Sequence, residues 1–247
     1  LASSAASDVY KRQLLYHPFI PPYRIDLFNT LSERYETDIV TMYNGDCNQA
    51  FKSKSLEHLM LFKPKAIKSK KYFFKILTSK KYDIIIPHEF GIVTIIAIIY
   101  RWWLKLTYRK SYRLIITVDD SYDMIANHNQ FSWKHKLATR LMLPLVDDMI
   151  NVEPRVVDYY RKHYGKGTYF PIICDDNRAE AELKACLPIS ERIIKEFNLE
   201  GKKILLYVGR LVELKNLRMV MQAYLSIQES NTIFSIICLL YTSDAAD

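Results

Sequence analysis

KILLYVGRLVELKNLRMVMQAYLSI, residues 203–227, contains the pattern that decides the fold. It begins with a short apolar strand, ILLYV (204–208), and continues through a polar loop that includes Gly209 and Arg210. Beyond Asn216, apolar residues recur at helical spacing, at Leu217, Val220, Met221, Tyr224 and Leu225. A short strand, a loop and an amphipathic helix form the repeating unit of a parallel α/β sheet.

The same alternation of strand and helix runs through the rest of the chain. Strand patterns occur at 14–16, 38–43, 82–86, 113–118, 148–152, 168–173 and 232–237. Helical patterns occur at 23–35, 70–79 and 92–106, within 131–146 with a kink or end at Pro144, and at 153–165 with Gly165 as C-cap. This alternation predicts an α/β fold, with a parallel sheet covered by helices on both faces.

The two ends of the chain do not read as native protein. SSAASDVYKRQ (3–13) and CLLYTSDAAD (238–247) are translations of one DNA sequence on opposite strands, because the reverse complement of codons for DVYKRQ, read one base along, encodes CLLYTS. This resembles the adapter of a transposase-made sequencing library translated as coding sequence. We therefore assign residues 1–13 and 238–247 to the adapter and exclude them from reasoning about the fold. The native stretch, 14–237, is then expected to be cut at both ends.

The composition limits which classes of binding partner and which cellular compartment are expected. The chain has 35 Lys and Arg, 27 Asp and Glu, and a formal net charge of +8. Positive charge favours anionic partners such as nucleotides, phospholipid or nucleic acid. Four cysteines without metal-type spacing favour a reducing, cytoplasmic setting. The most apolar stretch, 84–106, is interrupted by Pro87, Gly91 and Arg101, so it predicts a strand and a buried helix, with Trp102 and Trp103 inside, rather than a membrane span.

The pattern changes near residue 175. Residues 174–203 are polar and predict a connector followed by one short helix, SERIIKEF (190–197). The second strand–helix series holds one βαβ unit, which is too little to bury a core in isolation. We expect a Rossmann-like domain at 14–175, and at 176–237 a connector with the start of a second, incomplete Rossmann-like domain.

Polar residues after the strands are the first site candidates, because ligands of open α/β sheets lie beyond the carboxyl ends of the strands. The candidates are His17, Tyr23, Arg24, His88, Glu89, Asp119, Asp120 and Glu153. Each has a simpler alternative: a solvated loop, a turn cap for His17, or a helix first-turn residue for Glu153.

A second group of candidates lies between residues 209 and 216. Arg210 carries a fork of donors that suits phosphate oxygens, Lys215 adds a second cation, and Asn216 is a suitable N-cap for the helix that follows. Gly209 either lets another group approach closely or allows a bend. Because helix N-termini also attract anions, these residues predict a clamp for a diphosphate, with a solvated basic loop as the alternative.

The segment from Lys63 to Lys81 contains eight lysines and no acidic residue, with Tyr72, Phe73 and Phe74 among them. A basic and aromatic segment of this kind suits an anionic membrane surface. Nucleic acid is the less favoured partner, and a solvated helix face is the alternative without a ligand.

YVGRLVELKNLRMVMQAY (207–224) is similar to the V-G-R-L-x-x-x-K-N-hydrophobic pattern that opens the donor domain of GT-B glycosyltransferases, in particular family 4 (glycosyl transferases group 1). PPYRIDLFNTLSERYETDIVTMY (21–43) resembles the first loop, helix and second strand of that family's acceptor domain. DMINVEPRVVDYYRKHYG and TYFPIICDD (148–165 and 168–176) resemble the stretch leading out of it. The resemblance implies two facing Rossmann-like domains and transfer of a sugar from a nucleotide-sugar to a saccharide or lipid-linked acceptor, with retention of configuration.

The resemblance also implies roles for particular residues. Arg210 and Lys215 match the residues that bind the donor diphosphate and help it to leave, and Tyr23, Arg24, His88 and Glu89 fall on the acceptor side. Asp119 stands about where many relatives carry a histidine, which makes it our catalytic candidate. No cofactor and no metal are expected, since this fold usually needs none.

One part of the family pattern is absent. Its donor domain continues to a segment E-x(7)-E that grips the sugar and the ribose, and nothing here corresponds to it. We therefore expect a fragment of a transferase, inactive by itself, from a cytoplasmic enzyme that is peripheral at the inner face of the plasma membrane. The rival hypothesis is a basic α/β binding module that docks on membrane or nucleic acid and has no transferase activity.

Overall fold

The computed structural model describes residues 11–42, 57–67, 69–126, 131–209, 211, 213–227 and 231–238. Its internal contacts divide the chain into two compact units, Leu1–Cys174 and Asp175–Asp247, and each unit is described by itself. The origin of residues 1–13 and 238–247 stays a prediction. Gln13, the last residue that we assign to the adapter, is the first residue of a strand and is buried.

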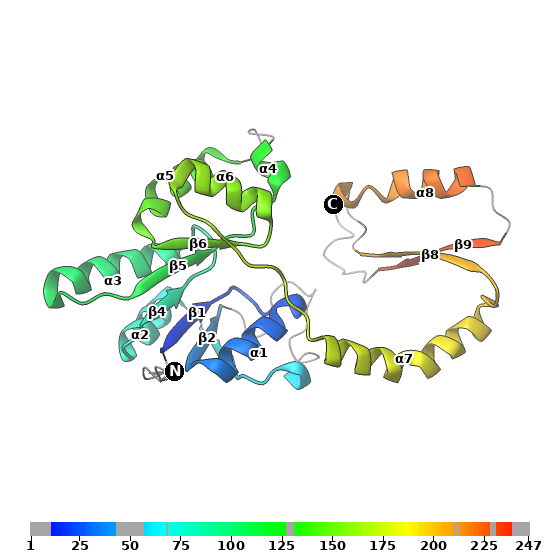
Figure 1. The fold of residues 1–247 in the computed structure, drawn as a ribbon, viewed down its shortest axis with the longest axis horizontal. Helices are drawn as coiled ribbons and strands as arrows, with labels where there is room; N and C mark the ends of the chain where they lie inside the picture. The colour runs from blue at the N-terminus through cyan, green and yellow to red at the C-terminus, as the bar shows by residue number, and fades with distance from the viewer. Residues whose placement is uncertain are drawn as a thin grey trace, which may run out of the picture. The chain divides into compact units, whose positions relative to one another are not determined.

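The first unit is built on a seven-stranded sheet in which all paired strands are parallel (Figure 1). The strands are Gln13–Tyr16 (β1), Thr37–Thr41 (β2), Lys65–Ala66 (β3), Ile84–Ile86 (β4), Arg113–Thr117 (β5), Asp148–Asn151 (β6) and Thr168–Tyr169 (β7). Their order is β3-β2-β1-β4-β5-β6-β7. The chain therefore builds outward from β1 in one direction and then continues from β4 in the other, which makes the β1–β4 pair the point where the strand order reverses.

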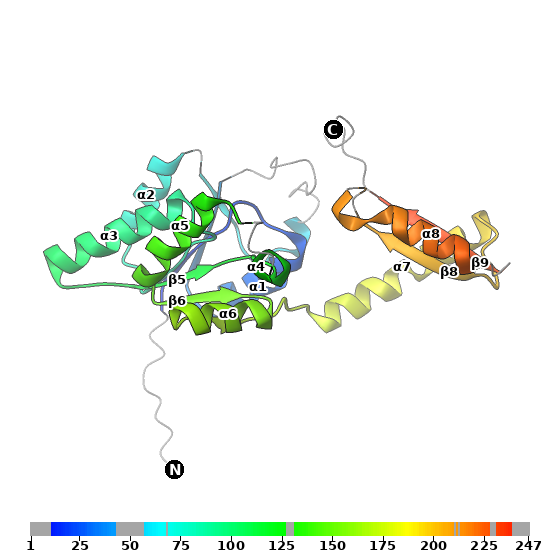
Figure 2. The ribbon, with the colours of Figure 1, turned by 90° about the horizontal axis from the view of Figure 1, so that it is seen from above.

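Helices cover the sheet on both faces. They are Ile25–Arg34 (α1), Lys70–Ser79 (α2), Ile92–Tyr108 (α3), Tyr122–Ala126 (α4), Trp133–Met142 (α5) and Pro154–Tyr164 (α6), with 3₁₀ turns at Pro22–Arg24 (η1), Glu57–Leu59 (η3) and Leu143–Leu145 (η4). Figure 2 shows α2, α3 and α5 together on one side of the sheet. Side chains alternate between the faces of a strand, and this alternation separates two hydrophobic clusters: Leu14, Val40 and Ile85 pack with α2 and α3, whereas Leu15, Ile39 and Ile86 pack with α1.

The helix ends follow from local chemistry. The Ser69 and Ser132 hydroxyls accept hydrogen bonds from the backbone N–H of Tyr72 and His135, which caps α2 and α5. Gly165 ends α6 in the left-handed region, with φ 67°, as the sequence predicts. The predicted end of the 131–146 helix at Pro144 is also confirmed, because α5 stops at Met142 and Pro144 lies in η4.

Two expectations for the first unit are wrong. Trp102 and Trp103 are about half exposed, because α3 buries only the stripe Val93, Thr94, Ala97, Ile98 and Arg101 and turns its other apolar residues away from the sheet. The last strand covers Thr168–Tyr169 and not 168–173. Pro171 has no N–H to donate to a ladder, and this limits the strand.

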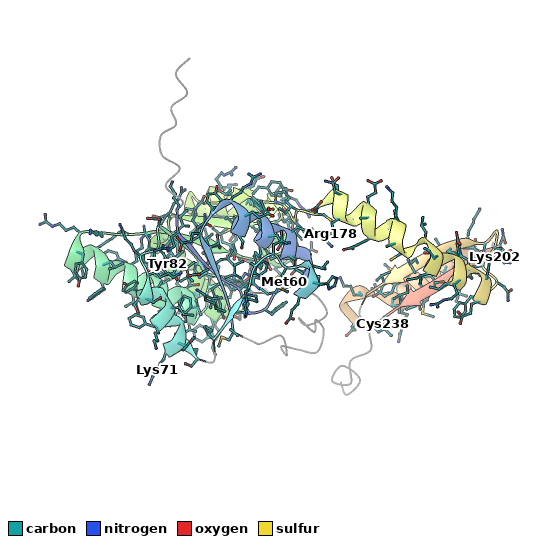
Figure 3. All side chains as sticks on the ribbon, turned by 90° about the horizontal axis from the view of Figure 1, so that it is seen from below. Met60, Lys71, Tyr82, Arg178, Lys202 and Cys238 are labelled. Atoms are coloured by element: carbon teal, nitrogen blue, oxygen red, sulfur yellow. The ribbon has the colours of Figure 1, made fainter. Side chains whose placement is uncertain are left out.

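The second unit consists of Asp176–Glu196 (α7), Lys203–Val208 (β8), Glu213–Lys215 (η5), Leu217–Ile227 (α8) and Thr232–Ile237 (β9). β8 and β9 pair in parallel over six residues and form the expected βαβ unit with α8. The prediction of a connector and a short helix at 174–203 is wrong, because one helix of 21 residues occupies this stretch. Asp175 caps it, the ion pairs Arg178–Glu182 and Lys184–Glu180 support its first half, and it continues through Pro188. Figure 3 shows the side chains of α7, with Arg178 near its start.

None of the described residues of the second unit is buried. Across the described part of the whole chain, no helix combines the length and the apolar character that a bilayer crossing requires.

Candidate functional site

The candidate site of the first unit lies where the strand order reverses. His17 follows β1, and His88 and Glu89 follow β4, which pairs with β1. Asp119 comes two residues after the end of β5, the next strand of the sheet. The sheet thus brings residues from three adjacent strand ends to one edge, where open α/β proteins bind their ligands.

Arg24 and Asp119 form the central ion pair of this site. An Nη2 hydrogen of Arg24 is donated to Asp119 Oδ1 over 2.5 Å, and 95 residues of sequence separate the partners. The 3₁₀ turn η1 positions Arg24, whose backbone N–H is donated to Pro21 O, and only 7% of Arg24 is exposed. The second carboxylate oxygen of Asp119, Oδ2, faces His88 Nε2 at 3.9 Å. The pair therefore fixes one oxygen of Asp119 and leaves the other directed into the site.

Two histidine rings lie beside this pair, with centroids 4.2 Å apart and ring planes tilted by 34°. His17 is 3% exposed, and its Nδ1 contacts the carbonyl of Phe19. A carbonyl oxygen can only accept, so Nδ1 of His17 carries the hydrogen and Nε2 carries a lone pair, which has no partner among the described residues. His88 Nδ1 lies 3.1 Å from the Thr117 hydroxyl. The Thr117 hydroxyl lies between His88 Nδ1 and, at 3.4 Å, the Pro87 carbonyl, and it anchors the His88 ring through Nδ1.

Both histidines are neutral at physiological pH. Burial lowers the pKa of His17 to about 3, and His88, once it is protonated at low pH, and Arg24 act in the same direction. Burial, together with Arg24, lowers the pKa of His88 to about 4. The site therefore offers two imidazole nitrogens that accept hydrogens or bind electrophiles.

Glu89 is held in a strained conformation next to the histidines. Its φ of 61° places it in the left-handed region, which is uncommon for a residue with a side chain. Its N–H is donated to Thr117 O, its carbonyl accepts from the Thr94 hydroxyl, and its Oε1 accepts from Asp119 N at 2.9 Å. Burial, helped by Asp120 and Asp119, raises the pKa of Glu89 to about 7. Glu89 therefore changes charge near neutral pH, as a group that exchanges protons with a substrate must.

A second layer of polar residues supports Asp120. The Tyr160 hydroxyl donates to Asp120 Oδ2 at 2.5 Å, and His135 Nε2 lies 3.6 Å from the same oxygen, an ion-pair distance beyond hydrogen-bond reach. Attraction to Asp120 raises the pKa of His135. Asn151 donates to the carbonyls of Val118 and Asp120 and fixes the β5 loop. The sequence does not reveal His135 and Tyr160 as site residues, because both lie within helical patterns.

His17, His88 and Asp119 also have the arrangement of metal ligands. One ligand atom from each lies within 4.8 Å of the others, the only such group of three among the described residues. Each histidine presents Nε2 while Nδ1 is anchored, as in ligating histidines, and Arg24 holds the carboxylate from behind. The same atoms suit sugar hydroxyls, which donate to them. The absence of a metal requirement stays a prediction.

Two sequence candidates lie at the margin of this cluster. Tyr23 is 45% exposed, with the Arg24 guanidinium 5.9 Å from its ring centroid. Burial, followed by Asp119, raises its pKa. Glu153 precedes α6, accepts from Tyr122 N at 2.8 Å and pairs with Arg155. Glu153 thus links α4 to α6, and none of its contacts among the described residues is to His17 or His88.

The predicted diphosphate clamp lies in the second unit and is only partly described. Arg210 falls outside the described residues. Gly209 follows β8, its N–H is donated to Ile237 O at 3.1 Å, and a Cβ there would lie 3.2 Å from the Tyr207 hydroxyl. Lys215 ends η5 and is exposed. Asn216 precedes α8 with φ 45°, and its backbone carbonyl accepts a hydrogen bond from Met219 N. The Tyr207 side chain is thus the nearest described group to a Cβ at Gly209, and the role of Gly209 in a clamp stays a prediction.

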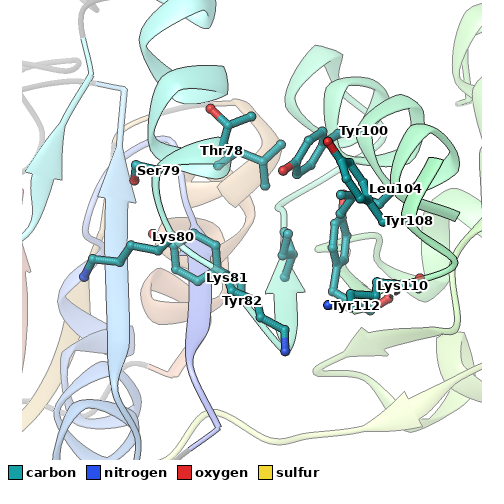
Figure 4. Close-up of a pocket in the computed structure, with 13 residues that line it drawn as sticks. Thr78, Ser79, Lys80, Lys81, Tyr82, Tyr100, Leu104, Tyr108, Lys110 and Tyr112 are labelled. Atoms are coloured by element: carbon teal, nitrogen blue, oxygen red, sulfur yellow. Dashed lines mark hydrogen bonds between the residues drawn. The ribbon is translucent and has the colours of Figure 1, made fainter.

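The lysine-rich segment 63–81 includes β3 and α2, with Lys68 outside the described residues. Phe73 and Leu77 are buried, whereas Tyr72 and Phe74 are about half exposed. A pocket of about 350 Å³ lies beside α2, between the amino ends of β4 and β5 and thus at the opposite edge from the histidines. Figure 4 shows its tyrosine-rich wall, formed by Tyr100, Tyr108 and Tyr112.

No protein-family model matches the chain, and no curated protein matches it. Solved structures that are similar over nearly the whole chain include two epimerases. UDP-N-acetylglucosamine 2-epimerase from Rickettsia bellii has a TM-score of 0.52 and 11% identity over 96% of this chain. UDP-GlcNAc 2-epimerase from Neisseria meningitidis, bound to UDP-GlcNAc, has a TM-score of 0.51 and 12% identity over 93%. The chain spans 63% of the Rickettsia enzyme and 72% of the Neisseria enzyme. These epimerases share the GT-B fold with glycosyltransferases, so the chain has an α/β fold of the GT-B type.

Proposed function

We propose that the chain is part of a retaining, family 4 glycosyltransferase, which moves a sugar from a nucleotide-sugar to a polysaccharide or lipid-linked acceptor. The observation that carries this proposal is the polar cluster at the β1–β4 reversal, formed by His17, Arg24, His88, Glu89 and Asp119. The GT-B fold and the Arg210–Lys215 pattern support it. In this proposal residues 14–175 form the acceptor domain, and 176–237 begin the nucleotide-sugar-binding domain.

The cluster would hold the acceptor hydroxyl. A hydroxyl that donates toward His17 Nε2 or Asp119 Oδ2 keeps its oxygen lone pair free to attack. In the transfer, the bond from the anomeric carbon to the donor diphosphate breaks, and the diphosphate leaves with the electron pair of that bond. The acceptor oxygen bonds to the anomeric carbon, and its proton passes to Asp119 Oδ2 or His17 Nε2. Arg210 and Lys215 would stabilise the charge on the diphosphate, and no metal is needed for that role.

We place the enzyme in the cytoplasm, at the inner face of the plasma membrane. The support is the basic segment 63–81 with the exposed rings of Tyr72 and Phe74, together with the half-exposed Trp102 and Trp103 on α3. Exposed lysine and aromatic side chains on two neighbouring helices favour an anionic bilayer.

Nucleotide-sugar binding tests the donor side. In the polypeptide encoded by the complete reading frame, Lys215→Ala should weaken binding of UDP-sugars by about tenfold or more, because a charge-assisted hydrogen bond contributes about 1.5–3 kcal/mol. Arg218→Ala is the matched control, since Arg218 is an exposed cation three residues later, in the first turn of α8. If calorimetry gives equal affinities for the wild type and Lys215→Ala, the prediction of a diphosphate clamp is wrong. Sugar transfer by residues 14–237 alone would contradict the fragment proposal.

A second candidate is epimerisation of a nucleotide-sugar. Both structural neighbours are UDP-GlcNAc 2-epimerases, and Glu89, with a pKa near 7, has the proton affinity that such a reaction uses. The products separate the candidates. A transferase consumes nucleotide-sugar only when an acceptor is present, whereas an epimerase converts UDP-GlcNAc to its C2 epimer without one, as proton NMR of the sugar would show. If neither product forms and the chain binds vesicles or nucleic acid in a salt-dependent manner, the binding-module hypothesis gains.

A further inference from the structure

An apolar groove runs between α3 and α5 on the surface of the first unit. Its volume is about 510 Å³. Its walls are Ile95, Ile98 and Ile99 from α3, Trp133, Lys134, Leu137, Ala138, Leu141 and Met142 from α5, with Phe90 and Leu145 at the ends. Ile99, Trp133, Leu137 and Leu141 each expose between 46% and 70% of their surface. An exposed apolar hollow of this kind marks a place where a ligand or partner is bound.

The groove is continuous with the candidate site. α3 follows β4 and α5 leads through η4 to β6, so both helices begin at the carboxyl edge of the sheet and end at the amino edge. Phe90, at one end of the groove, directly follows Glu89. The Phe90 ring packs edge-on against His135 at 5.5 Å, and His135 faces Asp120. The end of the groove at Phe90 therefore lies beside the polar cluster, and so does the corresponding end of a bound ligand.

The groove carries positive charge and no negative charge. Lys134 is the single charged residue of its lining, and its Nζ lies 5.9 Å above the Trp133 ring. Arg140 is exposed two turns further along α5. An apolar hollow with a cation at the end nearest the site is complementary to an amphiphile with an anionic head group.

We infer that the groove binds the hydrocarbon chain of a lipid-linked acceptor, with a phosphate beside Lys134 and the attached saccharide in the His17–Asp119 cluster. This inference rests on the proposed function, whose acceptor class it narrows to amphiphiles that present one long chain. The groove extends along α5 from Trp133 to Leu141, about 12 Å at 1.5 Å per residue. It therefore takes the segment of the chain nearest the phosphate, and the remainder stays outside.

A series of alkyl phosphates of increasing length, used below their micelle concentrations, tests the groove by calorimetry on the full chain. Each added methylene should tighten binding about fourfold, the factor expected for burying one CH₂ group, until the groove is filled. Leu137→Asp, at a 46% exposed position on the wall, should abolish the dependence on length. Leu106→Asp is the control, because Leu106 is 80% exposed on α3 and lies outside the groove.

The head group is tested separately. Lys134→Gln should weaken alkyl phosphates about tenfold and leave uncharged alkyl glucosides unchanged, because Lys134 contacts the phosphate and not the chain. If it weakens both classes equally, the phosphate assignment is wrong.

Three results would overturn the inference. Affinity that does not depend on chain length, or that depends on it equally in Leu137→Asp, means that the chain does not occupy the groove. Sedimentation that shows a dimer of the wild type and a monomer of Leu137→Asp makes the groove an interface between copies. Binding to vesicles containing phosphatidylglycerol without binding to monomeric alkyl phosphate makes it a membrane-facing surface. If affinity rises with the length of the alkyl phosphate but Lys215→Ala does not change nucleotide-sugar binding, the groove binds a hydrocarbon chain and the proposed transferase function is wrong.

Discussion

The two units of this chain support their candidate functional residues in opposite ways. In the first unit, His17 and Arg24 are buried at the reversal of a seven-stranded sheet, and side chains from three strand ends fix them. In the second unit, Lys215 and Asn216 are exposed on the loop of a single βαβ unit. The first site has its geometry before any ligand arrives, whereas the second offers charges whose geometry is not enforced by packing.

The difference follows from how much apolar surface each unit can bury. Strands β1, β4 and β5 have helices on their faces, and their side chains fill two hydrophobic clusters. β8 and β9 have one covering helix between them, and none of their residues is buried. A short segment buries too little to offset the entropy of ordering its chain.

Hydrogen exchange on the full chain provides the strongest test of this contrast. Backbone amides of β1 and β4 should exchange only through global unfolding, whereas amides of β8 and β9 should exchange through local opening. A gap of about 4 kcal/mol between these routes corresponds to roughly 1,000-fold slower exchange in the first unit. Mass spectrometry of peptic fragments measures this ratio.

Equal protection of the two sheets would break the comparison. It would mean that contacts not evident within the second unit stabilise β8 and β9. Added UDP-sugar is a useful second condition, because selective protection of β8 and α8 would show that the donor orders its own site.

The sequence predicts the fold well because the fold depends on periodicity. Strands at 14–16, 84–86 and 204–208 and the helices at 70–79 and 217–227 are visible as apolar patterns of period 2 or 3.6. The pattern does not show which face of an apolar helix is buried, and for this reason Trp102 and Trp103 were wrongly expected inside. The polar helix α7 was also missed, because its ion pairs and cap do not produce an apolar stripe.

The candidate site was predictable only in part. Arg24, His88, Glu89 and Asp119 are recognisable because each lies at or just beyond a strand end or its loop. Their pairing is not, since Arg24 and Asp119 are 95 residues apart and meet only through the strand order. His135 and Tyr160 lie on helices, where a polar residue on one turn carries no sign of the carboxylate that it faces.

The pH dependence of unfolding would sharpen the contrast, because the histidines of the chain all precede residue 175. The pKa of His17 falls from 6.5 in the unfolded chain to about 3 in the folded one. Its stabilising contribution is therefore complete above pH 6.5 and is lost as the pH falls toward 3. When the pH is lowered from 6.5 to 4.5, the unfolding free energy of the wild type should therefore fall by about 2–3 kcal/mol more than that of His17→Gln. Urea titrations at both pH values measure this difference.

Glu89 acts with the opposite sign and serves as the control. Its folded pKa, about 7, lies above the unfolded value of 4.5, so its contribution is complete below pH 4.5 and is lost as the pH rises through 7. Because its side chain is 39% exposed, solvent screening reduces the effect. Glu89→Gln should therefore steepen the loss of stability on acidification, and a change in the same direction as His17→Gln would show that the cluster titrates as a single unit.

Truncation of one cation in each unit compares the two sites directly. Arg24→Ala should lower the unfolding free energy by about 2 kcal/mol, below the usual 3–5 for a buried pair because Asp119 remains one-third exposed. Lys215→Ala should change it by less than about 0.5 kcal/mol, since Lys215 is exposed and forms no ion pair with any described residue. Thermal unfolding of both variants measures the contrast. A comparable loss in Lys215→Ala would show that the second site is also built into the fold.

Metal removal should have the smallest effect of all. The Arg24 guanidinium already neutralises Asp119, and the two histidines are held neutral by burial, so the cluster is stable without an ion. EDTA should therefore leave the unfolding midpoint unchanged. Addition of zinc is the more decisive part of the experiment, because His17, His88 and Asp119 have suitable ligand atoms within 4.8 Å of one another. If EDTA lowers the midpoint and zinc restores it in wild type but not in His17→Gln, the first unit is a metal site. In that case the two units would differ further. The first unit would neutralise negative charge with a metal ion, and the second would neutralise the donor diphosphate with Arg210 and Lys215.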